Sequence, residues 1–417
     1  NISLLTIIFS VVLVISFLIS GIYNSSEINW RFIITITVLN VYILSLVGVF
    51  SNFLIAFFEV PLSKLFQIIN VLILTVLVIF FATKTLSIEY VISALAISSS
   101  IYLFTLVLYT KNKYPKIVSG NLLVFDKKIF KETYKFIANT FIIAVASRVQ
   151  FYTDVLIIGF LLGLTQAGIY EINNKIPFYA TYLSSSFVVI FYPFMTSLFT
   201  RNNFGMLRTL YFSIQYLSII FAVSISLILL FYVEILLEYW IDSNIYLGTV
   251  IFSFMLISLI FHTLMGPIAS LFQAVGKNKF LMKLEVIIAI SNISLSLYLI
   301  KPYGLLGVIL GTVISQFGGF LFLYPYLLRT ILKVKLKELI KEVLAPLVLS
   351  LAILFFIFYK FWNFWKSFDN LTAVIFSAIL ITIIVTVVFL TIDYIFYKLN
   401  FKKNLVIDII TKIKQYS

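Results

Sequence analysis

Twelve hydrophobic stretches, each long enough to cross a membrane as a helix, fill most of this chain and constrain its fold more than any other feature. They are Ile2–Tyr23, Phe32–Phe58, Phe66–Thr83, Tyr90–Tyr109, Phe136–Leu162, Ala167–Phe199, Leu207–Leu236, Tyr246–Ala274, Phe280–Ile300, Leu305–Leu332, Leu344–Trp362 and Leu371–Tyr397. Apolar residues make up 62% of the 417 residues and charged residues only 11%, which is too little polarity for the surface of a water-soluble protein. Because lipid cannot satisfy backbone N–H and C=O groups, such runs predict an all-α polytopic membrane protein.

The basic residues between these stretches are distributed unevenly between the two sides of the membrane. If the stretches alternate in direction, 23 lysines and arginines fall on one side and five on the other. The five are Arg31, Lys84, Lys301, Lys360 and Lys366. The positive-inside rule assigns the basic side to the cytoplasm. We therefore expect a multi-pass protein of a bacterial inner membrane with both chain ends in the cytoplasm, and we attribute the net charge of +14 to this bias and not to nucleic acid binding.

Several kinds of chemistry are disfavoured by what the sequence contains. There is no cysteine, so thiol nucleophiles and thiolate metal sites are excluded. No phosphate-binding loop, zinc-ligand spacing or nucleophile elbow is present. The longest loop, about 26 residues, is too short to form a separate catalytic domain. We therefore expect neither an enzyme nor a bound cofactor or metal.

Four ionisable residues lie deep in two consecutive stretches, 136–162 and 167–199. They are Arg148, Asp154, Glu171 and Lys175. A charge inside a bilayer costs several kcal/mol, so such residues are functional candidates. Counting about 1.5 Å per residue puts the two cations near the midplane and the two carboxylates in the outer third. Two interpretations remain open: a charge-paired structural lock, or a water-filled path whose cations attract an anionic head group and whose carboxylates act as counter-ions or bind protons.

Further polar residues extend this region or lie elsewhere in the bundle. Asn173, Asn174 and Tyr179 continue the polar stretch, and we expect Pro177 and Pro193 to kink its helix.

Three weaker candidates lie in later stretches. We interpret His262, the single histidine, as a partner in an interhelical hydrogen bond. Lys283 and Glu285, near a cytoplasmic helix start, either snorkel or contribute to the inward mouth of a cavity.

The last helices also carry residues suited to packing. Asn292 and Gln316 can join neighbouring helices by hydrogen bonds. Gly304, Gly307 and Gly311 are spaced three and four residues apart, which predicts close helix packing.

Six short motifs together resemble one family of transporters. The runs are Asp154–Gly159, Ala167–Tyr170, Phe191–Phe194, Gln273–Lys277, Asn292–Leu295 and Tyr303–Thr312. In their order and spacing they resemble the polysaccharide and O-antigen repeat-unit flippases (Wzx-type) of the multidrug/oligosaccharidyl-lipid/polysaccharide (MOP) exporter superfamily.

The resemblance implies up to fourteen helices in two pseudo-symmetric helical lobes around a central cavity. The chain shows about twelve, so its first lobe looks short by two helices. The implied division is a four-helix N-terminal lobe, a basic cytoplasmic linker, a six-helix C-terminal lobe, and two appended helices with a basic tail. The corresponding residues are 1–110, 111–135, 136–333 and 334–417.

The resemblance also implies a substrate and a mechanism. The substrate is an oligosaccharide repeat unit linked to undecaprenyl pyrophosphate, moved from the cytoplasmic to the outer leaflet by alternating access and driven by proton or sodium exchange. Membrane lipid and other polysaccharide assembly proteins are the remaining expected partners. A pyrophosphate needs a cationic, water-accessible path, and the site we expect comprises Arg148, Asp154, Glu171, Asn174, Lys175 and Lys283.

Three alternatives remain. A multidrug or metabolite cation antiporter of the same superfamily, or a lipid II flippase, fits much of the same evidence. A membrane polymerase or ligase of the same sugars is disfavoured, because its chemistry needs a large outer loop and the outer loops here are short and poor in basic residues.

Overall fold

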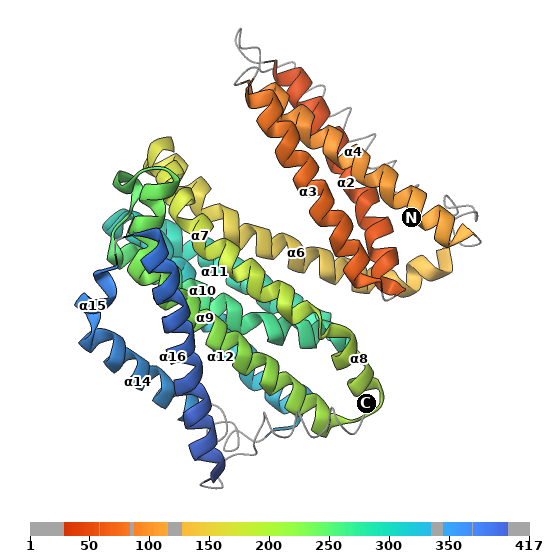
Figure 1. Ribbon diagram of the computed structural model, residues 1–417. Helices are drawn as coiled ribbons and strands as arrows, with labels where there is room; N and C mark the ends of the chain where they lie inside the picture. Colours follow the sequence, from red (N-terminus) through yellow and green to blue (C-terminus); the bar gives the residue numbers. More distant parts are fainter. Residues whose placement is uncertain are drawn as a thin grey trace. The chain divides into compact units, whose positions relative to one another are not determined.

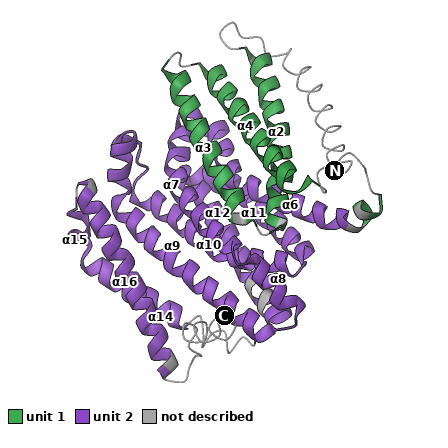
Figure 2. Cartoon of the chain, turned by 45° about the vertical axis from the view of Figure 1, so that its right-hand side comes forward, with its two compact units in different colours: residues 1–132 green, residues 133–417 purple. Residues whose placement is uncertain are grey.

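In the computed structural model, the described part of the chain is helical throughout (Figure 1). The described residues are 29–57, 59–83, 87–115, 127–334, 345–368 and 370–398. The described residues fall into two compact units, one within 1–132 and the other within 133–417 (Figure 2).

Ten of the described helices are long and apolar enough to cross a membrane, and they correspond to ten of the twelve expected stretches. The first stretch, Ile2–Tyr23, lies outside the described residues. Within the described residues the eleventh corresponds to α14 (Ala345–Lys360), an apolar helix of 16 residues. At 1.5 Å per residue that is about 24 Å, less than the roughly 30 Å of a hydrocarbon core.

The first unit contains three long helices, α2 (Trp30–Ala56), α3 (Val60–Ala82) and α4 (Ile88–Lys113). Both α2 and α3 pack against α4, around a small core of Val47, Leu54, Tyr102 and Leu106. Large aliphatic side chains cover the remaining surface of α3, where Val76 is 66% exposed. Such a face is stable against lipid tails and not against water.

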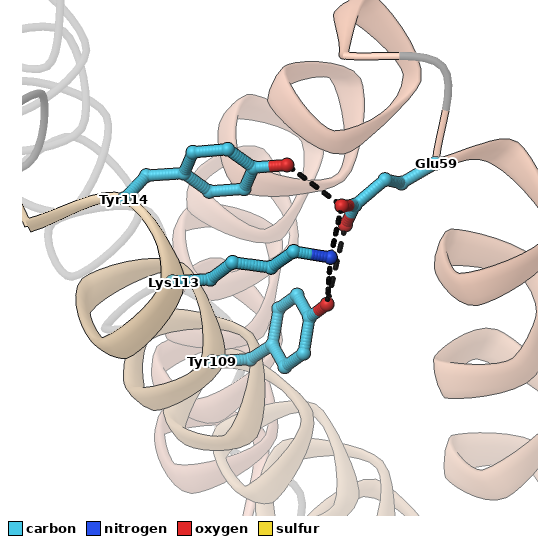
Figure 3. Close-up of polar contacts among 4 residues, drawn as sticks. All are labelled: Glu59, Tyr109, Lys113 and Tyr114. Carbon is cyan, nitrogen blue, oxygen red and sulfur yellow. Dashed lines mark hydrogen bonds and ion pairs between the residues drawn. The ribbon is translucent and has the colours of Figure 1, made fainter.

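A cluster of four polar residues joins the start of α3 to the end of α4 (Figure 3). Glu59 forms an ion pair with Lys113 and accepts hydrogen bonds from the hydroxyls of Tyr114 at 2.7 Å and Tyr109 at 3.3 Å. The Lys113 ammonium also donates to the Tyr109 hydroxyl at 2.9 Å. Hydrogen bonds from Lys113 and Tyr114 favour the carboxylate, so the pKa of Glu59 is lowered from its usual 4.5.

The second unit contains the remaining helices. They are α6 (Lys127–Leu161, whose first residues belong to unit 1), α7 (Leu164–Val189), α8 (Tyr192–Thr200), α9 (Phe204–Trp240), η1 (Ser243–Ile245), α10 (Thr249–Ala274), α11 (Asn278–Tyr303), α12 (Leu305–Leu327), η2 (Leu328–Leu332), α14, α15 (Trp362–Lys366) and α16 (Leu371–Lys398).

Helix α9 is the most buried span of this unit and contributes to three hydrophobic cores. It packs against α10, while α14 and α16 lie side by side and α16 contacts α9 (Figure 1). Two tyrosines of α9 hold the last helices through main-chain acceptors: Tyr232 donates to the carbonyl of Trp365 and Tyr216 to that of Phe389.

The stretch expected as one helix over 167–199 forms two. Helix α7 ends at Val189, and α8 begins at Tyr192 with Pro193 in its first turn. Proline fits a first helical turn but lacks the N–H that a continuing helix needs. Pro193 therefore marks a break and not only a kink, whereas Pro177 lies inside the continuous helix α7.

Basic residues from several turns of the second unit meet at one end of it. Arg208 donates to the carbonyls of Leu332 and Lys333, and Lys277 donates to that of Thr330. These bonds satisfy carbonyls that the end of η2 would otherwise leave unpaired. The contacts bring together the starts of α9 and α11 and the end of η2, as the alternating loops predict. We call this the basic end of the unit.

Helices α11 and α12 approach each other closely at glycines. A Cβ on Gly307 would overlap the carbonyl oxygen of Leu299, and one on Gly311 would lie 2.6 Å from the backbone nitrogen of Ser296. The predicted close packing is therefore confirmed for Gly307 and Gly311. Gly304 does something else: with φ of 56° it ends α11 in a conformation that favours glycine.

Replacing Gly307 with alanine should destabilise the protein by about 1 to 3 kcal/mol, because the added methyl must displace backbone of α11. Gly318→Ala is a matched control in the same helix, since a Cβ there meets no atom of the described residues within 4 Å. Thermal unfolding of the detergent-solubilised variants measures the difference, and equal melting temperatures would contradict the packing.

The ion pair and hydrogen bonds of Glu59 should stabilise the first unit only while its carboxyl group is ionised. Since the folded-state pKa of Glu59 lies below 4.5, its contribution is complete above 4.5 and is lost as the pH falls through the folded-state value. Glu59→Gln should therefore lower the melting temperature near neutral pH, with the deficit shrinking below pH 4.5. Glu238→Gln removes an exposed carboxylate at the end of α9 and should show no such pattern; a deficit for Glu59→Gln that is constant across pH would count against the cluster.

Candidate functional site

The most buried of the predicted site residues is Asp154 of α6, at 4% exposure. Its Oδ2 accepts hydrogen bonds from the hydroxyl of Tyr170 on α7 at 3.1 Å and from that of Thr312 on α12 at 2.6 Å. Asn292 of α11 donates in turn to the Thr312 hydroxyl at 2.8 Å. One carboxyl group thus connects four helices of the second unit. We call these four residues the Asp154 cluster.

Two acceptor atoms of this cluster have no hydrogen-bond partner among the described residues. They are Asp154 Oδ1 and Asn292 Oδ1, both buried. Buried polar atoms in proteins are nearly always paired, so each such exception calls for a water, an ion or a proton. Two oxygen acceptors, together with the hydroxyls of Tyr170 and Thr312, form the kind of donor set that suits a proton or an alkali cation.

A cavity of about 30 Å³ adjoins the cluster, with Asp154, Tyr170, Asn174 and Thr312 in its wall. This is enough room for at least one water molecule. We call it the Asp154 cavity. The predicted site residue Asn174 therefore faces the same space as Asp154.

Lys175 and Glu171 lie in a different cavity, of about 110 Å³, also lined by Tyr152, Asn174 and Tyr179. They form the predicted one-turn pair, with 4.0 Å between Lys175 Nζ and Glu171 Oε1, and the lysine side chain is 44% exposed. Arg148 is exposed and donates to the Tyr152 hydroxyl at 3.5 Å. Tyr152 therefore connects Arg148 to the cavity that contains Lys175.

The four charges predicted for α6 and α7 do not form a single paired lock. Among the residues that the structure describes, Asp154 and Arg148 make no ion pair, and the long Glu171–Lys175 contact is the one pair in the set. The structure separates a buried carboxyl group from a partly exposed cationic surface that contains Arg148 and Lys175. Asn174 lines both cavities.

Lys283 and Glu285 point in different directions from the start of α11. Lys283 is exposed. Glu285 accepts a hydrogen bond from Gln150 Nε2 at 2.9 Å and lines a third cavity. The structure does not bring Lys283 to the Asp154 cluster.

Sequence reasoning did not single out Tyr170, Thr312 and Gln150 as site residues. Uncharged hydroxyl and amide side chains are common in membrane helices, so type alone does not mark them. A usable signal was present nonetheless, because Tyr170 and Thr312 are the last residues of two of the motif runs.

His262 does not make the expected interhelical hydrogen bond through Nδ1, which has no partner among the described residues. Its ring instead packs against Phe151 of α6, with ring centroids 4.7 Å apart.

Solved structures with this fold are membrane transporters. A structure described as "Lipid II flippase MurJ, inward closed conformation" matches with a TM-score of 0.67 and 18% identity, over 95% of this chain and 83% of that one. An outward-facing multidrug resistance MATE family transporter of the MOP superfamily gives 0.65 and 11%, over 78% and 76%. A MOP superfamily transporter from Pyrococcus furiosus gives 0.59 and 12%, over 80% and 78%. No curated protein matches in sequence.

The helical bundle and these likenesses define a membrane protein with the fold of the MOP superfamily of transporters. Residues 1–199 match the family model described as "Polysaccharide biosynthesis protein". The N-terminal part of the chain is therefore similar to this family, and the likenesses to solved structures show that the chain has the fold of MOP superfamily transporters.

Thr312→Val should destabilise the protein by about 1 to 3 kcal/mol, because the buried Asp154 carboxyl loses its shorter hydrogen-bond donor while the side-chain shape is kept. Thr263→Val is the matched control: Thr263 is equally buried, but its Oγ1 has no partner among the described residues. Thermal unfolding compares the two variants, and a Thr312→Val protein as stable as Thr263→Val would argue against the hydrogen bond.

Proposed function

We propose that the protein is a flippase that moves oligosaccharide repeat units linked to undecaprenyl pyrophosphate from the cytoplasmic to the outer leaflet of a bacterial inner membrane. It works by alternating access and is coupled to proton or sodium exchange. The family match over residues 1–199 supports a role in polysaccharide biosynthesis, and the cations of α6 and α7 support an anionic, lipid-linked substrate.

The observation that carries this proposal is the cationic surface on α6 and α7. Arg148 lies in the middle of a membrane span without a carboxylate partner among the described residues, and Lys175 has only the 4.0 Å contact with Glu171. Unpaired cations at membrane depth are stable only beside water or an anion. A pyrophosphate supplies that anion, and guanidinium groups bind phosphate oxygens through two donors at once.

Within this mechanism the Asp154 cluster is the coupling site. Its two unpaired oxygens can take up a proton or a sodium ion. Binding there would tighten four helices at once, since Tyr170, Thr312 and Asn292 lie on three helices other than that of Asp154. A cation can therefore bias the arrangement of the unit, as coupled transport requires.

We also propose an orientation and a division into lobes for the chain. The basic end of the second unit faces the cytoplasm, in keeping with the positive-inside rule. The basic segment 111–135 links an N-terminal lobe, 1–110, to a C-terminal lobe, 136–333, and residues 334–417 are an addition to that pair. Lys283, at the basic end, attracts the anionic head group from the cytoplasm.

A lipid II flippase is the second candidate, because the structure so described matches 95% of this chain and lipid II also carries a pyrophosphate. The family match favours a polysaccharide repeat unit instead. An antiporter of organic cations is less well supported, because Arg148 and Lys175 would repel its substrate.

Removing both cations should abolish export of the substrate. A charged hydrogen bond is worth about 1.5 to 3 kcal/mol, so Arg148→Ala and Lys175→Ala should each weaken binding roughly tenfold to hundredfold. In a strain lacking the chain, the double variant should leave surface polysaccharide absent and lipid-linked units accumulating on the cytoplasmic leaflet.

Lys279→Ala, which removes an exposed charge at the basic end, should restore export like the unaltered chain. Surface polysaccharide and protein abundance are measured together. Full export by the double variant at normal abundance would refute the cation site, and normal surface polysaccharide in the strain without the chain would refute the substrate.

A further inference from the structure

A third cavity in the second unit has the character of a cation site. It encloses about 220 Å³, room for several water molecules. Its polar lining includes Ser147, Gln150, Ser270, Gln273 and Glu285. Among the described residues, Glu285 is the one charged residue of that lining, which includes no lysine or arginine from this part of the chain. We call this space the Glu285 chamber.

The Glu285 chamber shares a wall with the Asp154 cavity. Gln150, His262 and Gln316 line both spaces. Two of these side chains carry buried atoms without a hydrogen-bond partner among the described residues, His262 Nδ1 and Gln316 Oε1. The second belongs to a side chain that is only 5% exposed. The shared wall is therefore polar and able to exchange hydrogen bonds with whatever passes it.

The chamber also extends toward the basic end of the unit. Along α10 its lining runs from His262 to Gln273, which is about 16 Å at 1.5 Å per residue. Gln273 lies four residues before Lys277, whose ammonium bonds to η2 at the basic end. The chamber thus extends from the level of the Asp154 cavity toward the side of the membrane that the positive-inside rule assigns to the cytoplasm.

The charge of the chamber excludes the substrate head group and favours a cation. A single carboxyl group in low-dielectric surroundings repels pyrophosphate and attracts small cations. Gln150 donates one hydrogen bond to Glu285, which leaves further lone pairs of the carboxyl group for a cation. Lys283 does not neutralise the carboxyl group within the chamber, because residues two apart on a helix face nearly opposite directions.

We propose that the Glu285 chamber is a cation-binding vestibule through which the coupling cation passes between the cytoplasm and Asp154, with Gln150, His262 and Gln316 as the wall it crosses. This inference rests on the proposed coupling role of Asp154. It adds a second cation site, Glu285, and a route inside one unit that is separate from the cationic surface of Arg148 and Lys175.

The chain contains no cysteine, so single cysteines can report on the chamber directly. Ser147→Cys and Ser270→Cys place thiols at two partly exposed positions of its wall. The probes are a trimethylammonium methanethiosulfonate and a sulfonate methanethiosulfonate, similar in size and opposite in charge. Relative to the ratio of their rates with a small free thiol in solution, we expect the cationic reagent to be favoured about tenfold or more at both positions, and Glu285→Gln to return the ratio to that of the free thiol.

Thr200→Cys, on the exposed end of α8, is the control and should show the same rate ratio with and without Glu285→Gln. Melting temperatures confirm that each variant is folded. A thiol at Ser147 or Ser270 that reacts with neither reagent would overturn the aqueous chamber. A rate ratio no higher than that of the free thiol, or one unchanged by Glu285→Gln, would overturn the cation site.

Transport assays separate this proposal from the one on which it rests. Glu285→Gln should raise the cation concentration needed for half-maximal export about tenfold or more without changing the maximal rate, whereas Asp154→Asn should remove the cation dependence altogether. If Asp154→Asn leaves that dependence intact, the coupling role fails while charge-selective labelling of the chamber can still hold. If Glu285→Gln leaves the cation concentration for half-maximal export unchanged, the vestibule is refuted, while the coupling role of Asp154 is unaffected.

Discussion

The close approach of α11 and α12 is the constraint on which the rest of the second unit depends. Gly307 and Gly311 leave no room for a side chain against Leu299 and Ser296. The short distance between the helices lets Asn292 donate to Thr312, and Thr312 in turn donates to Asp154. The position of a carboxyl group on α6 is therefore fixed by the packing of two helices more than a hundred residues further along the chain. In a bilayer, where water cannot replace a missing donor, such a chain of hydrogen bonds is the condition for burying the carboxyl at all.

The structure keeps groups of opposite charge in different places on the same helices. Arg148 and Asp154 are both on α6, yet Arg148 is exposed beside Tyr152 while Asp154 is buried with Tyr170. A transporter that carries an anionic substrate and uses a cation needs this separation, because a cation site beside the pyrophosphate would be filled by the substrate's own counter-ions. Two helices can serve both ligands because residues a few positions apart face different sides.

Helix class and span positions followed from the sequence because each depends on composition along a single helix. The residues that surround Asp154 could not be predicted in this way. Tyr170, Thr312 and Asn292 come from three other helices, and no periodicity within one helix specifies which neighbour it will face. Depth counting placed Asp154 and Glu171 at the same level, and Tyr170, next to Glu171, does reach Asp154. Depth counting could not show that Glu171 faces another cavity, because the depth of a residue leaves the rotation of its helix about the helix axis undetermined.

The fold alone does not distinguish a sugar-lipid flippase from a drug antiporter, because the backbone does not determine which side chains face a cavity. Matched structures with TM-scores from 0.59 to 0.67 share only 11% to 18% of residues with this chain, so the common scaffold is compatible with different ligands. What differs is which charges the scaffold presents and where. Here the partly exposed surface of α6 and α7 is cationic, while the buried cluster and the chamber behind it are acidic. An organic cation would therefore meet repulsion at the exposed surface and find the Asp154 cavity too small, at about 30 Å³, whereas a small inorganic cation fits that cavity and the charge of a pyrophosphate suits only the exposed surface.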